Sequence, residues 1–202
     1  MDTFSFEREL AGKGVRLVAG LDEAGRGPLA GPVVAASVIL PADCEYVLFQ
    51  DSKKLTEKQR DSLFATLTGM GIPIGVGVAT PAEIDEINIL RASLLAMKRA
   101  VLALPEMPDY LLVDGKFPVP LQVRQQALVK GESKSASIAA ASIVAKVTRD
   151  RIMRDYHAAY PHYNFSRHKG YPTKEHRDLL LRFGPCAIHR KTFSGVQELL
   201  GQ

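Results

Sequence analysis

Two apolar runs that flank a glycine-rich turn constrain the fold of this chain more than any other feature. Residues 16–21 and 33–40 are rich in valine, leucine and other apolar side chains, which favour strands buried in a sheet. Residues 23–31 contain three glycines and a proline, the composition of a turn. The chain therefore starts with a hairpin-like pair of strands, and Asp22 and Glu23 lie where the first strand meets the turn.

Strand and helix patterns alternate along the rest of the chain. Thr56 and Thr80 each begin a capping box, and alanine-rich or amphipathic periodicity marks further helices. The expected elements are helices at 56–70, 80–104, 135–157 and 173–184, a strand at 72–79, and short apolar strands at 110–113 and 127–129. This order predicts one α/β domain with a mixed central sheet flanked by helices, and a C-terminal helical extension over about residues 158–202.

Hydropathy and cysteine content argue against several classes of protein. The longest apolar run, residues 31–40, is far shorter than the roughly 20 residues of a membrane-spanning helix. The acidic N-terminus lacks the basic and apolar segments of a secretory signal. Cys44 and Cys186 lie far apart without metal-ligand spacing, so we expect unpaired thiols. We therefore expect a cytoplasmic monomer with no membrane partner.

The charge is distributed unevenly along the chain. The net charge is +4, but residues 124–202 carry 14 Lys and Arg against 6 Asp and Glu, a net +8, which leaves −4 for residues 1–123. A basic C-terminal part suits a polyanionic partner, and an acidic N-terminal part suits a local site for cations. A basic surface that is merely solvated, without a partner, would show the same excess of Lys and Arg.

Four carboxylates are expected at the ends of strands. Asp22 and Glu23 follow the first strand, Asp114 follows the strand at 110–113, and Glu132 follows the third short apolar run. Carboxylates that converge at one sheet edge repel one another without cations, and an oxygen-only set selects Mg²⁺ or Mn²⁺. Two such ions can activate water and stabilise the leaving oxygen of a phosphodiester. Taken singly, each carboxylate also fits a surface turn or a helix cap.

The glycines of the first turn allow a ligand to approach the backbone closely. Gly25 and Gly27 flank Arg26, so the amides of this segment can contact a sugar or phosphate. The segment also faintly matches a dinucleotide-binding loop. A strand rather than a helix follows Pro28, however, and the preceding carboxylates would repel a pyrophosphate.

Several basic and polar residues are candidates for phosphate contacts. Lys53 and Lys54 precede a capped helix, while Ser142 and Lys146 lie four residues apart on one face of another. Each lysine also fits a solvated surface position. His168 has no second histidine or cysteine to complete a catalytic triad, so a structural or phosphate-contacting role suits it better than that of a general base.

Taken together, these motifs resemble the bacterial ribonuclease HII family, the type 2 ribonucleases H. The resemblance rests on GLDEAGRGPLAGPV at 20–33, DSKKL at 51–55, VDG at 113–115, SIAAASIVAKVTRD at 137–150 and HKGYPT at 168–173. These segments stand in family order and span nearly the whole chain. The resemblance implies a ribonuclease H-like fold in a single catalytic domain.

The resemblance also implies an activity and a metal site. The family hydrolyses the RNA strand of RNA–DNA hybrids, incises at single ribonucleotides in duplex DNA during replication and repair, and leaves 5′-phosphate and 3′-hydroxyl ends. Asp22, Glu23 and Asp114 match its catalytic, metal-binding positions. The fourth position is usually aspartate after Lys-Gly, whereas here it is Glu132, whose extra methylene alters its reach.

The resemblance also implies which residues recognise the RNA-to-DNA junction. Gly25, Arg26 and Gly27 would contact the ribose 2′-hydroxyl, the group that distinguishes RNA from DNA. Tyr171 would pack on the deoxyribose of the next nucleotide. A non-catalytic hybrid-binding module of the same fold is the alternative, although binding alone would be better served by neutral or basic residues than by four carboxylates.

Overall fold

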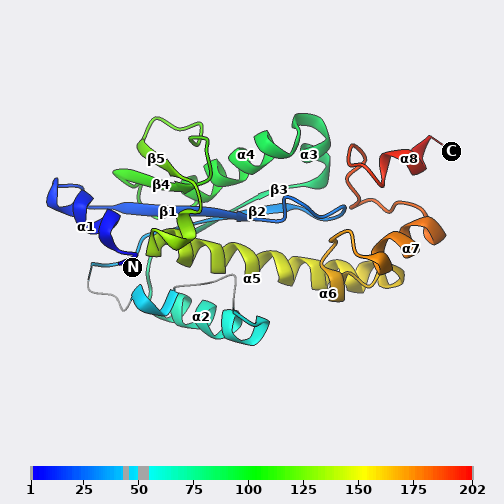
Figure 1. Cartoon of the computed structure of the whole chain (residues 1–202), viewed down its shortest axis with the longest axis horizontal. Coiled ribbons are helices and arrows are strands. Elements are labelled where there is room, and N and C mark those ends of the chain that lie inside the picture. Colours follow the sequence, from blue (N-terminus) through cyan, green and yellow to red (C-terminus); the bar gives the residue numbers. More distant parts are fainter. Residues whose placement is uncertain (1, 43–45, 50–54, 202) are drawn as a thin grey trace.

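A five-stranded mixed sheet forms the centre of the fold in the computed structural model, which describes residues 2–42, 46–49 and 55–201 (Figure 1). The strands are β1 (Val18–Ala24), β2 (Val33–Val38), β3 (Ile74–Ala79), β4 (Tyr110–Asp114) and β5 (Arg124–Leu128). Their order is β3-β2-β1-β4-β5. The pairs β1–β2 and β2–β3 are antiparallel, while β1–β4 and β4–β5 are parallel. The mixed sheet expected from the sequence is therefore present.

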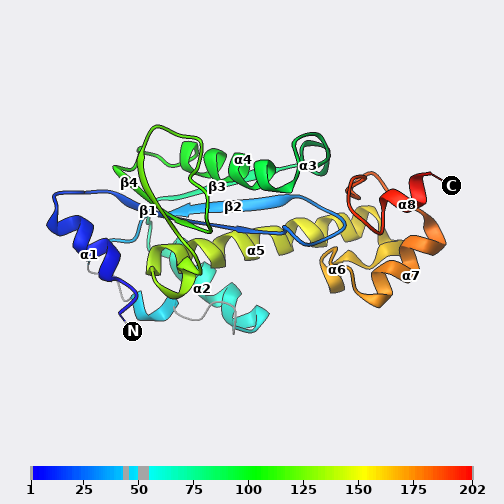
Figure 2. The ribbon, with the colours of Figure 1, turned by 45° about the horizontal axis from the view of Figure 1, so that its top comes forward.

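Helices cover both faces of this sheet. Helices α3 and α4 lie on one face and α5 on the other, with α2 packed outside α5 and α6 to α8 gathered at the far end of α5 (Figures 1 and 2). The helices are α1 (Ser5–Gly12), α2 (Glu57–Gly69), α3 (Pro81–Ile87), α4 (Ile89–Leu102), α5 (Ala136–Ala159), α6 (Phe165–His168), α7 (Lys174–Phe183) and α8 (Gln197–Leu200). Short 3-10 turns occupy Tyr46–Phe49, Gly131–Ser133 and Pro161–Tyr163.

The core has a layer on each side of the sheet. Leu21 and Val113 pack with Met97 of α4 on one side, and Ala36 packs with the alanine-rich face of α5 on the other. Gly20 lies at the centre of β1, where a Cβ would be 2.1 Å from the Ser137 carbonyl carbon. Glycine at this position therefore allows the first turn of α5 to pack directly on the strand that carries Asp22 and Glu23.

The C-terminal segment packs on α5 and on the turn after β1. Met153, Phe165 and Ile188 form one buried cluster with Ala30. Val196 forms a second buried cluster with Leu29 and Leu180. These two clusters hold the residues beyond α5 against the turn that joins β1 to β2.

The structure corrects four details of the expected elements. The strand expected at 127–129 is observed as β5 at Arg124–Leu128. The helical region at 80–104 is two helices, because Asn88 adopts a φ of +68° and its side chain accepts the amide hydrogens of Leu90 and Arg91 to cap α4. Strand β1 extends to Ala24, so Asp22 and Glu23 lie within the strand. Helix α1 had no clear sequence signal.

In the part of the chain that the structure describes, no helix has the length and apolar character needed to cross a membrane.

Candidate active site

Two neighbouring parallel strands bring the predicted carboxylates together. Leu21 of β1 pairs with Val113 of β4, so the next residues, Asp22 and Asp114, lie at the same level on adjacent strands. Both side chains and that of Glu23 line a pocket of about 440 Å³. The parallel pairing therefore places three carboxylates on the wall of one cavity.

Burial and mutual repulsion disfavour the charged forms of two of these groups. Asp22 is buried, and its burial, followed by the charges of Glu23 and Asp114, raises its pKa well above the ordinary 3.8. The Ser142 hydroxyl and the Glu23 amide oppose this shift by donating hydrogen bonds to Asp22. Burial also raises the pKa of Glu23, against the lowering effect of Arg26, whose Nη1 lies 3.2 Å from Glu23 Oε1.

Asp114 connects the pocket to the segment that carries Glu132. The Gly131 amide donates to Asp114 Oδ1 at 2.6 Å, and Lys130 turns the chain there with a φ of +57°. Glu132 therefore follows a residue bonded directly to the pocket wall. It is not among the described residues that line the pocket. The structure thus brings Asp22, Glu23 and Asp114 into one cavity and leaves Glu132 beside it.

The donor chemistry of the pocket suits a hard divalent cation. Its carboxylates supply only oxygen atoms, and Glu23 Oε2 is buried without a hydrogen-bond partner among the described residues. As the described side chains lie, no group of three or more His, Cys, Asp or Glu forms a ready-made metal site. A cation bound between these carboxylates would relieve the repulsion of Asp22 by Glu23 and Asp114.

The glycine-rich turn and Tyr171 form another part of the pocket lining. Gly25 has a φ of +99°, and a Cβ there would lie 2.1 Å from Arg149 Nε. At Gly27 the nearest atom to a Cβ would be Tyr171 Cε1, at 4.0 Å. Gly25, Arg26, Gly27 and Tyr171 all line the pocket. Tyr171 is 39% exposed, so its ring is accessible from solvent.

Basic and hydroxyl side chains complete the lining. Ser142 and Lys146 both reach the pocket from α5. Lys146 Nζ lies 2.5 Å from Asp150 Oδ1, and its burial lowers the pKa of its ammonium despite this partner. Lys53 and Lys54 fall outside the described residues.

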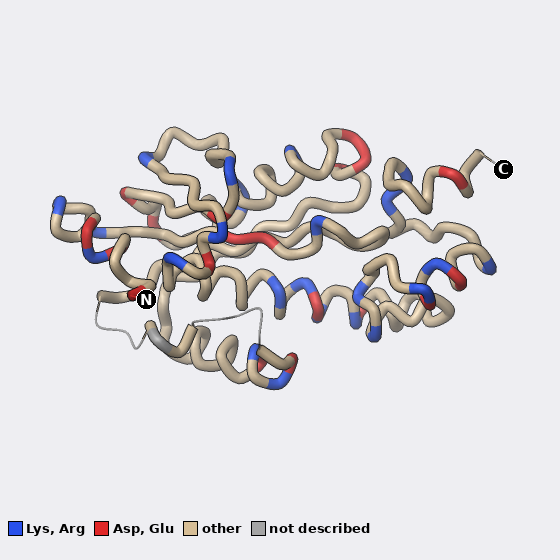
Figure 3. The backbone as a smooth tube through the Cα atoms, viewed as in Figure 1, with Lys and Arg blue, Asp and Glu red and all other residues tan. Residues whose placement is uncertain are grey.

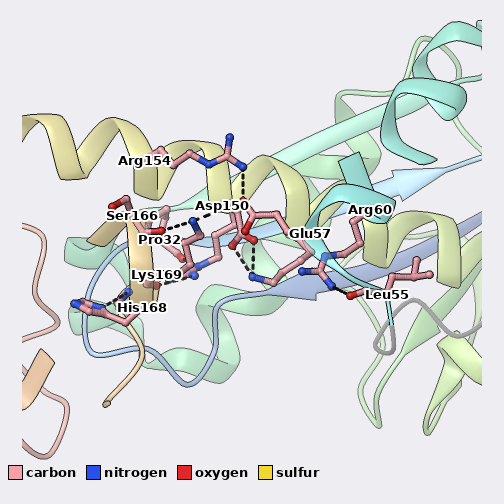
Figure 4. Close-up of polar contacts among 12 residues, drawn as sticks. Pro32, Leu55, Glu57, Arg60, Asp150, Arg154, Ser166, His168 and Lys169 are labelled. Atoms are coloured by element: carbon pink, nitrogen blue, oxygen red, sulfur yellow. Dashed lines mark hydrogen bonds and ion pairs between the residues drawn. The ribbon is translucent and has the colours of Figure 1, made fainter. Parts of the chain in front are cut away.

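Arg60 is a lining residue that sequence reasoning missed. It lies on α2, where its guanidinium donates to the Leu55 carbonyl, and α2 itself is tied to α5 by an ion pair of 2.8 Å between Glu57 and Arg154 (Figure 4). The sequence offered one signal for Arg60: it lies in the first turns of the helix capped by Thr56, shortly after Lys53 and Lys54. The fold is needed to show that this turn of α2 faces the carboxylates.

His168 is a structural residue. It is 6% exposed, its Nε2 lies 2.6 Å from the Tyr163 carbonyl oxygen, and its Nδ1 accepts the Gly170 amide. Both ring nitrogens are therefore engaged with the backbone. Cys186 is a free thiol, and Cys44 lies outside the described residues.

The Lys and Arg residues of the C-terminal part are spread along α5 and the segments beyond it (Figure 3). Helix α5 also contributes Ser142 and Lys146 to the pocket. Among the Lys and Arg residues of 124–202, Lys146 therefore lines the carboxylate pocket.

Comparisons with known proteins identify the family and the fold of this chain. The sequence model of the ribonuclease HII family matches residues 19–196. The ribonuclease HII of Desulfotalea psychrophila is 58% identical over 98% of this chain and 89% of its own length. The crystal structure of the ribonuclease H2 from Pyrococcus horikoshii OT3 superposes with a TM-score of 0.75 at 28% identity, covering 91% of this chain and 97% of that one.

A more distant structure shares the fold alone. Bst-RNase HIII in complex with Mn²⁺ has a TM-score of 0.66 at 18% identity, covering 92% of this chain and 69% of that chain. The ribonuclease H-like fold expected from the resemblance is thus confirmed. With the family match over most of its length and the strong identity to a curated relative, this chain belongs to the ribonuclease HII family, whose members are nucleases that hydrolyse phosphodiester bonds.

Proposed function

We propose that this chain is a metal-dependent endonuclease that cuts the RNA strand of RNA–DNA hybrids and incises 5′ to single ribonucleotides embedded in duplex DNA. The products carry 5′-phosphate and 3′-hydroxyl ends. The observation that carries the proposal is a single pocket in which three carboxylates share the lining with a glycine-rich turn and Tyr171.

The carboxylates form the metal-binding part of the proposed site. Asp22, Glu23 and Asp114 would hold Mg²⁺ or Mn²⁺, with Glu132 reaching in from the neighbouring turn. The Mn²⁺ complex of the structurally similar Bst-RNase HIII supports this choice of ion. When bound, a pair of such ions lowers the pKa of the attacking water and stabilises the leaving oxygen. The Ser142 hydroxyl orients the Asp22 carboxylate, and Arg26 orients that of Glu23.

The remaining lining residues recognise the substrate. The amides at Gly25, Arg26 and Gly27 contact the ribose 2′-hydroxyl, and the Tyr171 ring, next to Gly27, packs on the following deoxyribose. Phosphates are contacted by cationic and hydroxyl groups. These groups are Arg60, Ser142 and Lys146 of the lining, together with Lys53 and Lys54, which fall outside the described residues.

The setting of the enzyme is part of the same proposal. It acts as a cytoplasmic monomer in replication and repair, and residues 158–202 are an extension of a single catalytic domain. The clusters that pack this extension on α5 and on the turn after β1 support its inclusion in that domain.

The test is cleavage of an end-labelled DNA duplex that contains one ribonucleotide. It is run with Mg²⁺, with Mn²⁺ and with chelator, beside an all-DNA duplex. We expect metal-dependent incision 5′ to the ribonucleotide and an intact control. Binding of the ribonucleotide duplex without incision in either metal would instead favour a non-catalytic hybrid-binding module.

A further inference from the structure

Two arginines are buried next to the glycine-rich turn. Arg149 comes from α5 and Arg190 from the segment after α7, and both side chains are fully buried. Neither forms an ion pair with a carboxylate among the described residues. A buried charge without a counter-ion is costly unless hydrogen bonds compensate for the lost water. The positions of those hydrogen bonds show what the two guanidinium groups hold in place.

All the acceptors are backbone carbonyls, and five of the six belong to the turn between β1 and β2. Arg190 donates through Nε to Gly31 at 3.0 Å, through Nη1 to Arg26 at 3.0 Å and through Nη2 to Gly25 at 2.5 Å. Arg149 donates to the carbonyls of Pro32 at 3.0 Å, Ala30 at 3.2 Å and Lys169 at 3.1 Å. Pro32 and Lys169 lie close together beside α5 (Figure 4).

These hydrogen bonds fix the direction of the amides in the turn. In a trans peptide the N–H group points opposite to the C=O group of the same plane, and the described chain has no cis peptide bond. The Gly25 and Arg26 carbonyls point at Arg190, so the amides of Arg26 and Gly27 point away from it. Neither amide donates to an acceptor within the described residues. Both N–H groups are therefore available to a ligand.

Arg149 connects this turn to the tyrosine. Its guanidinium carbon lies 5.7 Å from the centroid of the Tyr171 ring, within the range of a cation–π contact. Its side chain also occupies the space beside Gly25 that a Cβ would need. One arginine therefore touches both parts of the pocket that read the junction.

We propose that Arg190, supported by Arg149, is a positioning residue for ribonucleotide recognition, which orients the Arg26 and Gly27 amides toward the 2′-hydroxyl of the substrate. The inference rests on the proposed function, since it explains how that site tells RNA from DNA. The planar guanidinium is essential to it. Only a fixed fork of donors can hold three carbonyls at once, whereas a lysine ammonium retains the charge without that geometry.

The decisive variant is Arg190→Lys. Incision kinetics give KM for the duplex with one ribonucleotide, and the matching all-DNA duplex, added as a competitor in the same metal-containing buffer, gives Ki. The ratio of Ki to KM measures recognition of the 2′-hydroxyl. We expect this ratio to fall about tenfold, through a rise in KM with Ki unchanged, as for the loss of about 1.4 kcal/mol of specific binding. A merely structural role would lower the active fraction, and hence apparent kcat, and leave the ratio unchanged.

The matched control is Arg99→Lys. Arg99 of α4 also donates to a backbone carbonyl, that of Val78 at 2.6 Å, but it is not among the described residues that line the pocket. The control should keep the wild-type ratio. If Arg190→Lys does not fold, Arg149→Lys and Phe193→Leu carry the test. The Phe193 ring lies 4.9 Å from the Arg190 guanidinium carbon, and its loss should lower the ratio by a smaller factor.

Three results separate the possible failures. A high ratio in the wild type that is kept in every folded variant of Arg190, Arg149 and Phe193 would overturn the positioning role alone. A ratio near one in the wild type would overturn the proposed function and this inference with it. An equal fall in Arg99→Lys would show that the effect is unrelated to the turn, and would also refute the inference.

Discussion

Acidification should destabilise this protein through two buried histidines, His176 and His189. The Cys186 amide donates to His189 Nδ1 at 2.9 Å, so the neutral His189 ring carries its proton on Nε2. His189 Nε2 lies 3.0 Å from His176 Nε2, and His176 Nδ1 lies 3.0 Å from the Tyr171 carbonyl oxygen. The two rings therefore form a chain of hydrogen bonds that exists only while both are neutral.

The pKa values give the size and the pH range of the effect. Burial is the main cause that lowers the pKa of both rings from the ordinary 6.5 to about 4. Charge repulsion contributes to both shifts: His176 acts on His189, and His168 acts on His176. The unfolded chain thus takes up protons near pH 6.5 and the folded chain only near pH 4. Stability is full above about pH 6.5 and falls as the pH drops toward 4. Between pH 7 and pH 5 the loss is about 2 kcal/mol for each histidine.

The assay is urea unfolding followed by far-UV circular dichroism at pH 7 and pH 5. In His189→Gln, the difference in unfolding free energy between these two pH values should be smaller than in the wild type by about 2 kcal/mol. The variant should also be less stable at pH 7, by about 1–3 kcal/mol, because the Cys186 amide loses its acceptor. Comparing differences between variants removes the contributions of other titrating groups, including the pocket carboxylates.

His162→Gln is the matched control, since His162 is an exposed histidine of the same segment. It should keep the wild-type difference between the two pH values. If His189→Gln and His162→Gln both retain the full wild-type pH dependence, the histidine chain does not titrate as the structure requires and the reasoning is wrong.

Three substitutions test the site and the packing around it. Asp114→Asn should abolish turnover with little loss of hybrid binding, because the role proposed for this carboxylate is to hold metal; incision at a near-normal rate would contradict that proposed role. Tyr171→Ala should weaken the preference for a lone ribonucleotide over long hybrids, and an unchanged ratio of the two rates would contradict the role proposed for Tyr171 at the junction. Gly20→Ala should lower the urea midpoint, since its Cβ would meet the Ser137 backbone at 2.1 Å, with a cost of about 1–3 kcal/mol from overpacking; a stability equal to the wild type would show that α5 can move away from β1.

Much of the fold was predictable because its signals are local. The capping boxes at Thr56 and Thr80 are present, and the helix expected at 135–157 is observed as Ala136–Ala159. The break at Asn88 was not predicted, since the apolar periodicity on either side hides a single residue with positive φ. Helix α1 was missed for a related reason, because its start at Phe4 has no capping side chain.

Residues that line the candidate site were partly predictable from the sequence, but their supporting contacts were not. Asp22, Glu23 and Asp114 stand out because a carboxylate at the end of a buried strand needs an explanation. Arg60 and Arg190 do not stand out, because each is one basic residue among many until the fold shows what it faces. Arg190 lies 165 positions from Gly25, its hydrogen-bond acceptor, and sequence periodicity carries no information over such a separation.

That separation also sets the order in which the enzyme can be completed during synthesis. All the strands lie before residue 129, so the sheet and its carboxylates can assemble while the ribosome is still making the last third of the chain. The carbonyls of Gly25, Arg26 and Gly31 acquire their guanidinium partner only when residue 190 has emerged. A nascent or prematurely terminated chain would therefore carry the acidic residues of a nuclease before the turn beside them is held in shape. If Arg190 has the role proposed above, selectivity for RNA is among the last properties this molecule gains.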